Sequence, residues 1–409
     1  MPAVSLPITL TTPIQFKSYS ENEDYLVEEK PEPNHRSQTL VYCSRESQWW
    51  IKVTFRGRVY DILNEPTISH RTSKKERRKQ FQNFVRLIDY GALPLLDDTV
   101  TELILDDGGQ GSKVIIHAFE EFTSNPFVKI AAKLRCTIRE DPSRVIYPSC
   151  DEFPSFRCIN SSELCDKTEI TDGVFQVRNA NSKMPYILKV VNRPLYQPHD
   201  TEVIRKELEN LEIFRGAPNI VQAAGIEVST NPYMTSNTRD QPLIVSGIVL
   251  EFYSGGSIQR VLSEHRLLEH SWEKWPKQIA IALDWFHAAG ITHMDIKPSN
   301  VVLDADGNAV LIDISGIGGI THGWRAPEIR DEISPNELPY RVRKSNDTWA
   351  YGKFLSELVR HAKDSPITRI LKRIAGCLMV ESVHGRMTMF EAISELSGID
   401  NIDRSLPQT

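Results

Sequence analysis

The residues that most constrain this chain are four polar side chains in the segments HMDIKPSN and LIDISG. Lys297 follows Asp295 by two positions and Asn300 follows it by five, and Asp313 lies 18 residues after Asp295. Phosphoryl transfer requires a carboxylate that orients the attacking hydroxyl, a cation beside the moving phosphate, and oxygen ligands that hold Mg²⁺. These four residues are of the types that supply all three. The alternative, an exposed turn with incidental acids, does not predict the partners found elsewhere in the sequence.

Two short apolar stretches between these segments predict how the four residues come together. Residues 301–303 and 309–312 are apolar, and the turn-forming residues DADGN separate them. This pattern is typical of a two-stranded hairpin. We therefore expect the hairpin to return Asp313 to the same cleft as Asp295.

The composition restricts the class of protein and its partners. The 409 residues have room for roughly two to three domains, and 40% hydrophobic residues suffice for a sizeable core. A formal net charge of −6 argues against nucleic acid or an anionic membrane as the main partner. No apolar run reaches about 18 residues, which argues against a membrane span. The six cysteines include no C-x-x-C pair, so we expect reduced thiols in a cytoplasmic or nuclear protein.

The segment around Asp295 and Asp313 resembles the catalytic loop and the metal-binding segment of the eukaryotic protein kinase superfamily, of the Ser/Thr type. The resemblance extends over roughly residues 164–400. Lys189 in YILK stands at the place of the family's strand lysine, and Glu207, 18 residues later, stands at the place of the helix glutamate that pairs with it. The resemblance implies an α+β, bilobal protein-kinase-like fold in which this pair grips the phosphates of ATP.

The resemblance also implies where the adenine of ATP binds. Val174 stands at the place of the valine that covers adenine. The segment VLEFYSGGSI resembles the hinge between the two lobes, with Leu250 at the gatekeeper position. The backbones of Glu251 and Tyr253 would then face adenine. We expect Val174, Glu251 and Tyr253 to contact the nucleotide.

For the transfer step, the resemblance implies a role for each polar residue of the two central segments. Asp295 would orient the acceptor hydroxyl, and Lys297 would compensate charge on the moving phosphoryl group. Asn300 and Asp313 would hold Mg²⁺. Lys297 at this position is typical of the Ser/Thr type. The expected cofactors are ATP and Mg²⁺, and the expected acceptor is a hydroxyl of a protein or small molecule that the sequence does not identify.

Three further matches indicate structural contacts rather than chemistry. Glu328 in WRAPE is expected to pair in the core with Arg386 of HGRMT. Asp347 in SNDTWAYG is expected to accept hydrogen bonds from the backbone of the catalytic loop. Removing one partner of a buried ion pair destabilises a fold, so we expect Arg386 to matter for folding and not for transfer.

The segment before Val174 departs from the family pattern. The glycine-rich lid is missing, because CDKTEITDG offers Gly173 alone. Glu169 and Asp172 lie near the expected phosphates, and their charges would repel ATP unless the turn is short and faces outward. Ile187 replaces the small alanine over adenine and takes space in that pocket. These changes favour the alternative of a pseudokinase scaffold or binding module with weak or no nucleotide turnover.

The segments that regulate the family and dock its substrates are also altered. Met294 replaces the catalytic-loop arginine that would pair with a phosphorylated activation loop. Ile314 and Ser315 replace the second and third residues of D-F-G, and the segment from there to Glu328 is short. We expect any activity to be independent of phosphorylation at Ser315 and Thr321. The reduced docking platform leaves a second alternative, a small-molecule kinase.

The rest of the chain carries no motif that points to a chemical function. We expect a flexible segment at 1–38, a small α/β or α+β region at 39–140, a linker at 141–163 and the kinase-like domain at 164–400. Within the second of these, RTSKKERRK at 71–79 is strongly basic. It is either a nuclear-localisation or phosphate-binding patch, or the solvated start of a helix.

Overall fold

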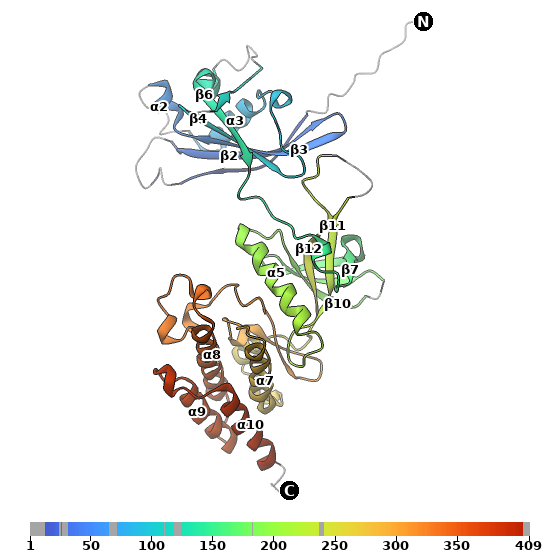
Figure 1. Cartoon of the computed structure of the whole chain (residues 1–409), viewed down its shortest axis with the longest axis vertical. Coiled ribbons are helices and arrows are strands. Elements are labelled where there is room, and N and C mark those ends of the chain that lie inside the picture. The colour runs from blue at the N-terminus through green and yellow to red at the C-terminus, as the bar shows by residue number, and fades with distance from the viewer. Residues whose placement is uncertain are drawn as a thin grey trace. The chain divides into compact units, whose positions relative to one another are not determined.

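The computed structural model describes residues 13–23, 26, 32–64, 72–109, 111–117, 124–181, 183–236 and 241–403. The chain divides into two compact units (Figure 1). Unit 1 comprises residues 1–144 and 230–242, and unit 2 comprises residues 145–229 and 243–409. Each unit contains a six-stranded sheet together with helices, which confirms the predicted α+β class.

Unit 1 is built on a mixed sheet with the strand order β1-β2-β3-β4-β6-β5. Strands β3 and β4 run parallel, and the other paired neighbours run antiparallel. The elements are β1 (Ile14–Glu21), β2 (His35–Ser44), β3 (Ser47–Arg56), α2 (Val59–Leu63), α3 (Lys74–Val85), β4 (Val100–Asp107), β5 (Ser112–Lys113), α4 (Pro126–Ile130) and β6 (Leu134–Glu140).

The core of unit 1 lies between this sheet and helices α3 and α4. Phe81 and Phe84 of α3 and Phe127 of α4 are almost fully buried in one cluster with the inward side chains of the central strands. The ring of Phe127 lies 5.1 Å and 5.6 Å from the other two rings. Helix α3 begins where the hydroxyl of Ser73 accepts a hydrogen bond from the Glu76 N–H at 3.2 Å.

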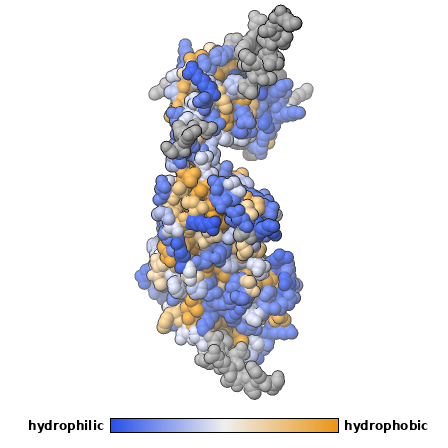
Figure 2. Space-filling model, turned by 90° about the vertical axis from the view of Figure 1, so that its right-hand side faces the viewer, coloured by the Kyte–Doolittle hydropathy of each residue, from blue (hydrophilic) through white to orange (hydrophobic). Residues whose placement is uncertain are grey.

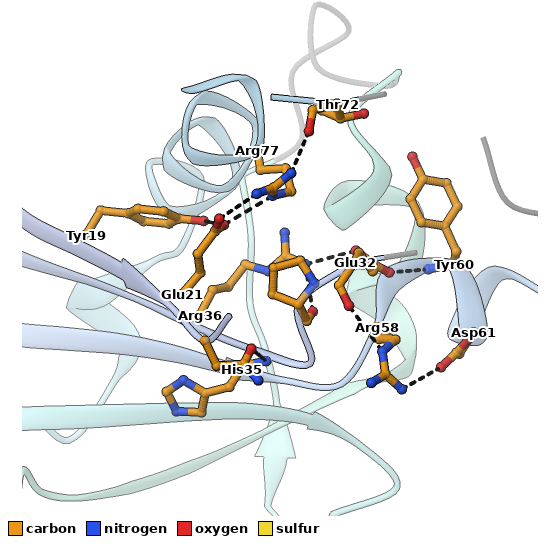
Figure 3. A network of polar contacts seen from close by, with 12 residues as sticks. Tyr19, Glu21, Glu32, His35, Arg36, Arg58, Tyr60, Asp61, Thr72 and Arg77 are labelled. Carbon is orange, nitrogen blue, oxygen red and sulfur yellow. Dashed lines mark hydrogen bonds and ion pairs between the residues drawn. The ribbon is translucent and has the colours of Figure 1, made fainter. Parts of the chain in front are cut away.

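A network of buried ion pairs joins the first strands of unit 1 to its first helices (Figure 3). The guanidinium of Arg36 contacts the Glu32 carboxylate at 2.9 Å, and neither side chain is more than 3% exposed. The same carboxylate accepts a hydrogen bond from the Tyr60 N–H at 2.9 Å. Glu21 of β1 pairs with Arg77 of α3 at 2.5 Å. The cavity beside the network measures about 10 Å³, about the space of one water molecule, so the network leaves little room for a ligand.

The structure differs from the flexible segment expected at 1–38. Residues 14–21 form β1, an edge strand whose side chains alternate between half-buried and exposed for part of its length. Because one face of an edge strand remains in water, its sequence is more polar than that of a central strand. Residues 1–12, 24–25 and 27–31 lie outside the described part of the chain.

The basic run at 71–79 has partners in the acidic segment that precedes β2. Arg77 is buried against Glu21, and Lys74 contacts Glu23 at 3.4 Å on the surface. The interpretation as a solvated helix start therefore fits Lys74 but not Arg77. The first residue of the run lies outside the described residues.

Unit 2 has a sheet-rich part followed by a helical part, the bilobal arrangement expected from the sequence (Figure 1). Its larger sheet has the order β7-β11-β12-β10-β9-β8, and β13 and β14 form the predicted hairpin, with Val301 opposite Leu311. The elements are β7 (Cys158–Asn160), β8 (Leu164–Thr171), β9 (Val174–Asn179), β10 (Pro185–Val190), α5 (Pro198–Ile213), β11 (Ala223–Thr230), β12 (Leu243–Glu251), α6 (Ile258–Ser263), α7 (Trp275–Ala288), β13 (Val301–Leu303), β14 (Ala309–Leu311), α8 (Tyr340–His361), α9 (Pro366–Leu378) and α10 (Met389–Asp403).

The core of unit 2 is one large apolar cluster that includes Trp275 and Phe286 of α7 and Tyr351 and Phe354 of α8, all fully buried. Hydrophilic residues cover much of the face drawn in Figure 2, and hydrophobic residues lie between them in small groups. Among the described helices, none is long and apolar enough to cross a membrane.

The segment expected to be a linker at 141–163 lies mostly within unit 2. Residues 158–160 form β7, which adds a parallel strand beside β11. The Val245 N–H of β12 donates to the Pro148 carbonyl at 2.8 Å. The segment therefore packs on the sheet rather than running free, and we call residues 145–163 the strap.

The segment between β11 and β12 belongs to unit 1, which interrupts the continuous domain expected at 164–400. The indole N–H of Trp50 donates to the Pro232 carbonyl at 2.9 Å, and its ring meets that of Tyr233 edge-on at 5.5 Å. Thr235 exchanges two hydrogen bonds of 2.9 Å with Asp98. Such long-range pairing carries no local sequence signal.

Candidate active site

Lys189 lies at the centre of a charged triad. Strand β10 holds it between β9 and β12, opposite Val174 and Ile248. Its Nζ atom lies 2.5 Å from Oε1 of Glu207 on α5 and 2.5 Å from Oδ1 of Asp313, which follows β14. The side chain of Glu207 is 4% exposed and that of Asp313 is 45% exposed. The pair predicted between Lys189 and Glu207 is therefore present, and Asp313 joins it.

The charges of the triad shift one another's pKa values. Burial alone would lower the pKa of Lys189, but the carboxylates of Asp313 and Glu207 outweigh it and raise that pKa. The charge of Lys189 lowers the pKa of Asp313, while burial raises the pKa of Glu207 despite the same neighbour. Asp313 is the more exposed and the more readily ionised carboxyl, so it is the one that can meet a cation.

The catalytic loop between α7 and β13 is closed by hydrogen bonds among its own polar residues. Lys297 Nζ lies 2.6 Å from Oδ2 of Asp295. The Asn300 amide donates to the backbone oxygen and to Oδ2 of Asp295, both at 2.9 Å. Asp295, Lys297 and Asn300 thus form one fixed group.

Thr321 completes this group, and sequence reasoning considered it only as a phosphorylation site. Its hydroxyl lies 2.7 Å from Lys297 Nζ, and its N–H donates to Oδ1 of Asp295 at 3.0 Å. Ser315, the other candidate phosphorylation site, is buried, and its hydroxyl accepts from the Gly318 N–H at 3.0 Å. The sequence showed only that a hydroxyl residue, Thr321, lies shortly before WRAPE. Its contact with Lys297 became visible only in the structure.

Asp347 accepts hydrogen bonds from the backbone of the catalytic loop, as predicted. It is fully buried and accepts hydrogen bonds from the backbone N–H groups of His293 and Met294, both at 2.8 Å. Met294 has a φ of 68°, in the left-handed region that costs a non-glycine residue free energy. The bonds to Asp347 hold this conformation in place.

The Met294 side chain lies in an apolar cluster. Its buried neighbours there are Ala326 and Ile329 from the end of the segment after Asp313, and Trp349 of α8. An apolar side chain therefore packs where the family has an arginine that pairs with phosphate. This packing fixes the end of the segment without a charged group.

A cavity of about 690 Å³ opens beside the triad and the catalytic loop. Six of the nine predicted site residues line it, namely Val174, Lys189, Glu207, Asp295, Lys297 and Asp313. Asn300 is not among the described lining residues, but its side chain is hydrogen-bonded to Asp295, which is. The structure thus gathers residues from β9, β10, α5, the catalytic loop and the segment after β14 around one space.

The missing glycine-rich lid is replaced by the two-residue turn Asp172-Gly173 between β8 and β9. Gly173 has a φ of +73°, and a Cβ there would lie 2.6 Å from the Cβ of Arg193, so only glycine fits without displacement. The Val190 N–H donates to the Gly173 carbonyl at 2.9 Å and fastens the turn to β10. The turn is short, which is one of the two conditions under which Glu169 and Asp172 would not repel ATP. Asp172 nevertheless lines the cavity, whereas Glu169 is not among the described residues that do.

The cavity stops short of the predicted adenine contacts Glu251 and Tyr253, neither of which is among its described lining residues. The Glu251 N–H donates to the Gln222 carbonyl at 3.0 Å, and the Tyr253 hydroxyl accepts from the Gln222 N–H at 3.1 Å. Ile187 packs against the main core cluster. The contacts of Glu251 and Tyr253 with a nucleotide stay predictions.

Asn300 and Asp313 have the chemistry that Mg²⁺ requires. The bonds from the Asn300 amide nitrogen to Asp295 orient its Oδ1 atom away from that carboxylate. Hard oxygen ligands of this kind suit the ion. No group of three or more candidate ligands of the His, Cys, Asp or Glu type occurs among the described residues, so phosphate and water oxygens would have to complete the coordination.

The predicted ion pair between Arg386 and Glu328 is confirmed. Two nitrogens of Arg386 contact the two carboxylate oxygens at 2.7 Å and 3.1 Å. The guanidinium also donates to the carbonyls of Val380 and Ser345. It lies away from the cavity lining and ties the end of the Asp313–Glu328 segment to the helical part of unit 2.

Comparison with known proteins points in the same direction as the geometry. The protein kinase domain family matches residues 171–373. CBL-interacting serine/threonine-protein kinase 26 of Arabidopsis thaliana is 30% identical over 201 residues, 46% of this chain and 42% of its own length. CBL-interacting protein kinase 31 of Oryza sativa subsp. japonica is 28% identical over 212 residues, which are 48% of this chain and 44% of its own length. CBL-interacting serine/threonine-protein kinase 3 of Arabidopsis thaliana is 27% identical over 157 residues, which are 38% of this chain and 31% of its own length. The chain spans less than half the length of these relatives.

Proposed function

This chain contains a domain of the eukaryotic protein kinase superfamily, and from that premise we propose that it moves the γ-phosphoryl group of Mg·ATP to a hydroxyl. The observation that carries the proposal is the group formed by Asp295, Lys297, Asn300 and Thr321, which faces the triad of Lys189 across one cavity. The acceptor would be a protein Ser/Thr hydroxyl, in keeping with the Ser/Thr-type relatives.

The roles of the side chains follow from their surroundings. Lys189 is held charged and immobile by Glu207, so it can bind the α and β phosphates of ATP without a cost in side-chain ordering. Asn300 and Asp313 would hold Mg²⁺, which when bound neutralises charge on the phosphates. Asp313 lines the cavity, and Asn300 is hydrogen-bonded to Asp295, which also lines it.

On the acceptor side, Asp295 accepts hydrogen bonds and has no proton of its own to give when ionised. It can therefore orient an acceptor hydroxyl and take its proton as the oxygen attacks phosphorus. Lys297, 2.6 Å away, would compensate the charge on the phosphoryl group as the bond to ADP breaks. Thr321 fixes both residues through its hydroxyl and its N–H.

The test is transfer of labelled phosphate from Mg·ATP to a panel of Ser/Thr peptides and small hydroxyl compounds. The wild-type chain is expected to label at least one acceptor class. Asp295→Asn should lower kcat by roughly 10²-fold or more and leave ATP affinity nearly unchanged, because this residue meets the acceptor rather than the nucleotide. A parallel loss of ATP affinity would contradict the division of roles.

A second candidate function is a pseudokinase scaffold, and one observation favours it. The cavity does not reach Glu251 and Tyr253, where adenine should bind, and Ile187 packs nearby in the core. Small-molecule phosphorylation is a third, because the segment from Asp313 to Glu328 leaves a short platform for peptides. The same assay separates the three: no label, label on peptides, or label on small hydroxyl compounds.

The compartment also belongs to the proposal. All six cysteines are free thiols. Reduced thiols fit a cytoplasmic or nuclear kinase rather than a secreted one.

A further inference from the structure

The strap bonds to the beginning of helix α5 through its backbone. The Ile146 N–H donates to the hydroxyl of Tyr196, just before the helix, at 3.0 Å. The Thr201 hydroxyl, in the first turn, donates to the Ile146 carbonyl at 2.6 Å. Thr201 is only 4% exposed. Both polar groups of one strap residue are thus used to hold the start of α5.

The strap also contacts the middle and the end of α5. Two nitrogens of Arg205 contact both carboxylate oxygens of Glu152, at 3.1 Å and 2.7 Å. Arg215, just past the helix, donates to the carbonyl and hydroxyl of Ser155, both at 3.1 Å. Its guanidinium lies 5.4 Å from the ring centre of Phe156. The contacts therefore span the whole length of the helix.

Two aromatic side chains of the strap are buried in the main apolar cluster of unit 2. Phe153 and Phe156 are 6% and 8% exposed, and their rings meet edge-on at 6.4 Å. They belong to the same buried cluster as Ile204, Leu208 and Leu211 of α5. Burial of two phenylalanines supplies more free energy than the half-exposed pair of Glu152 and Arg205.

The strap is itself fixed to the sheet of unit 2. Pro148 accepts the hydrogen bond from β12 described above, and the Arg157 carbonyl accepts one from the Ile226 N–H of β11 at 2.9 Å. Strand β7 extends the same sheet. Because its anchors lie in a sheet, the strap can restrain a helix that packs against it.

The opposite side of α5 carries the catalytic contact. At about 100° per residue, Glu207 points roughly 200° away from Arg205, so one faces the triad while the other faces the strap. On the triad side, Asn210 donates to the Ile314 carbonyl at 2.6 Å. Helix α5 is therefore held between the strap and the segment that follows Asp313.

We propose that the strap is a built-in positioning element that keeps α5 in the place where Glu207 meets Lys189. Phe153 and Phe156 are its principal positioning residues, and they act through α5 without touching substrate. The inference rests on the proposed function for its consequence in catalysis. A chain that carries this element needs no phosphorylated loop or added partner to bring Glu207 to the lysine.

The test uses the full chain with Phe153→Ala and Phe156→Ala combined. Amide hydrogen exchange should rise at least tenfold in α5 and stay within twofold in α7. In the transfer assay, kcat should fall at least tenfold, and Phe153→Leu with Phe156→Leu should recover most of both readouts. If the alanine variant does not fold, Thr201→Val replaces it, because it removes one hydroxyl and little volume. Exchange should then rise in the first turn of α5.

Leu396→Ala in α10 is the matched control, since Leu396 is buried in the same cluster but lies on a helix that packs on α7. It should leave α5 exchange unchanged relative to the rest of unit 2. The proposal is overturned if amide exchange in α5 is unchanged in the strap variants. It is also overturned if exchange rises equally throughout unit 2, as in a general loss of stability. If the wild-type chain transfers no phosphate, the proposed function fails, and the exchange result still decides the strap.

Discussion

The chain contains two charged networks of similar composition in two different settings. In unit 1, Arg36 and Glu32 pair with at most 3% of either side chain exposed, beside a cavity of about 10 Å³. In unit 2, Lys189 meets Glu207 and Asp313 at the edge of a cavity of about 690 Å³, and the Asp313 side chain is 45% exposed. We call the first the closed network, because it leaves room for about one water molecule, and the second the open network, because it borders a much larger space.

Ion pairing alone therefore does not identify a functional site. The closed network pairs Arg36 with Glu32 and hydrogen-bonds to backbone groups, so we interpret it as structural. The open network places two carboxylates against one lysine and leaves one of them accessible. A change in the first should therefore affect unfolding, and a change in the second should affect chemistry.

The largest expected effect is on catalysis. Lys189→Met and Asp313→Asn should each lower phosphoryl transfer by about 10² to 10³-fold, because under the proposed function each removes a charge that would bind the transferring phosphates or their metal. The midpoint of thermal unfolding should change by only a few degrees in Asp313→Asn, because this side chain is 45% exposed. It should fall further in Lys189→Met, which leaves the buried Glu207 carboxylate without its cation. Lys372→Met, at an exposed position of α9, is the control and should do neither. Full activity in folded Lys189→Met would show that the triad is structural, as in unit 1.

The next effect is on the stability of unit 1. Arg36→Ala leaves the Glu32 carboxylate buried without its partner and should cost about 3 to 5 kcal/mol of unfolding free energy. Combining Arg36→Met with Glu32→Gln should recover most of it, since neither charge then remains buried. Denaturant unfolding followed by hydrogen exchange in unit 1 measures both. Lys74→Ala, from the surface pair with Glu23, should cost less than about 1 kcal/mol.

These effects show which parts of the molecule its sequence could predict. The hairpin was predicted from its local pattern, and the pairs of Lys189 with Glu207 and of Arg386 with Glu328 were predicted from the resemblance to protein kinases, which names partners far apart in the sequence. The pairing of Glu21 with Arg77 was not, because the two residues are 56 positions apart and either alone resembles a solvated charge.

The strap and the role of Thr321 were missed for a related physical reason. Phe153 and Phe156 lie in a stretch rich in proline and cysteine that resembles a linker, and only the folded structure shows that they are buried. Thr321 was considered as an acceptor of phosphate, yet its hydroxyl bonds to Lys297. In both cases the decisive partner comes from another element.

A smaller effect concerns regulation. Met294 packs with Ala326 and Ile329, so the segment after Asp313 is held without phosphate. Phosphatase treatment should therefore leave transfer within about twofold of the untreated protein, whereas Thr321→Ala should lower it roughly tenfold through loss of the bond to Lys297. Thr321→Ser, which keeps the hydroxyl, is the control. Loss of transfer on phosphatase treatment would contradict the packing argument.

The smallest effect is a pH dependence of unit 1. Burial would raise the pKa of Glu21, but hydrogen bonds from Arg77 and Tyr19 outweigh it, so this pKa lies below its usual value of 4.5. Its contribution to stability is therefore present above pH 4.5 and lost as the pH falls through the lowered pKa. Urea unfolding between pH 6 and pH 3 should show a shallower pH dependence in Glu21→Gln. An identical dependence would mean that Glu21 does not contribute.

The central claim, that the open network is a working nucleotide site, is tested most directly by the thermal unfolding of unit 2 with and without Mg·ATP. A ligand at 100 times its dissociation constant should stabilise the folded state by about 2.7 kcal/mol. We expect this shift in the wild-type chain and in Arg36→Met with Glu32→Gln, and we expect its loss in Lys189→Met and Asp313→Asn. No shift at millimolar Mg·ATP in the wild-type chain, or an equal shift in the triad variants, would contradict it.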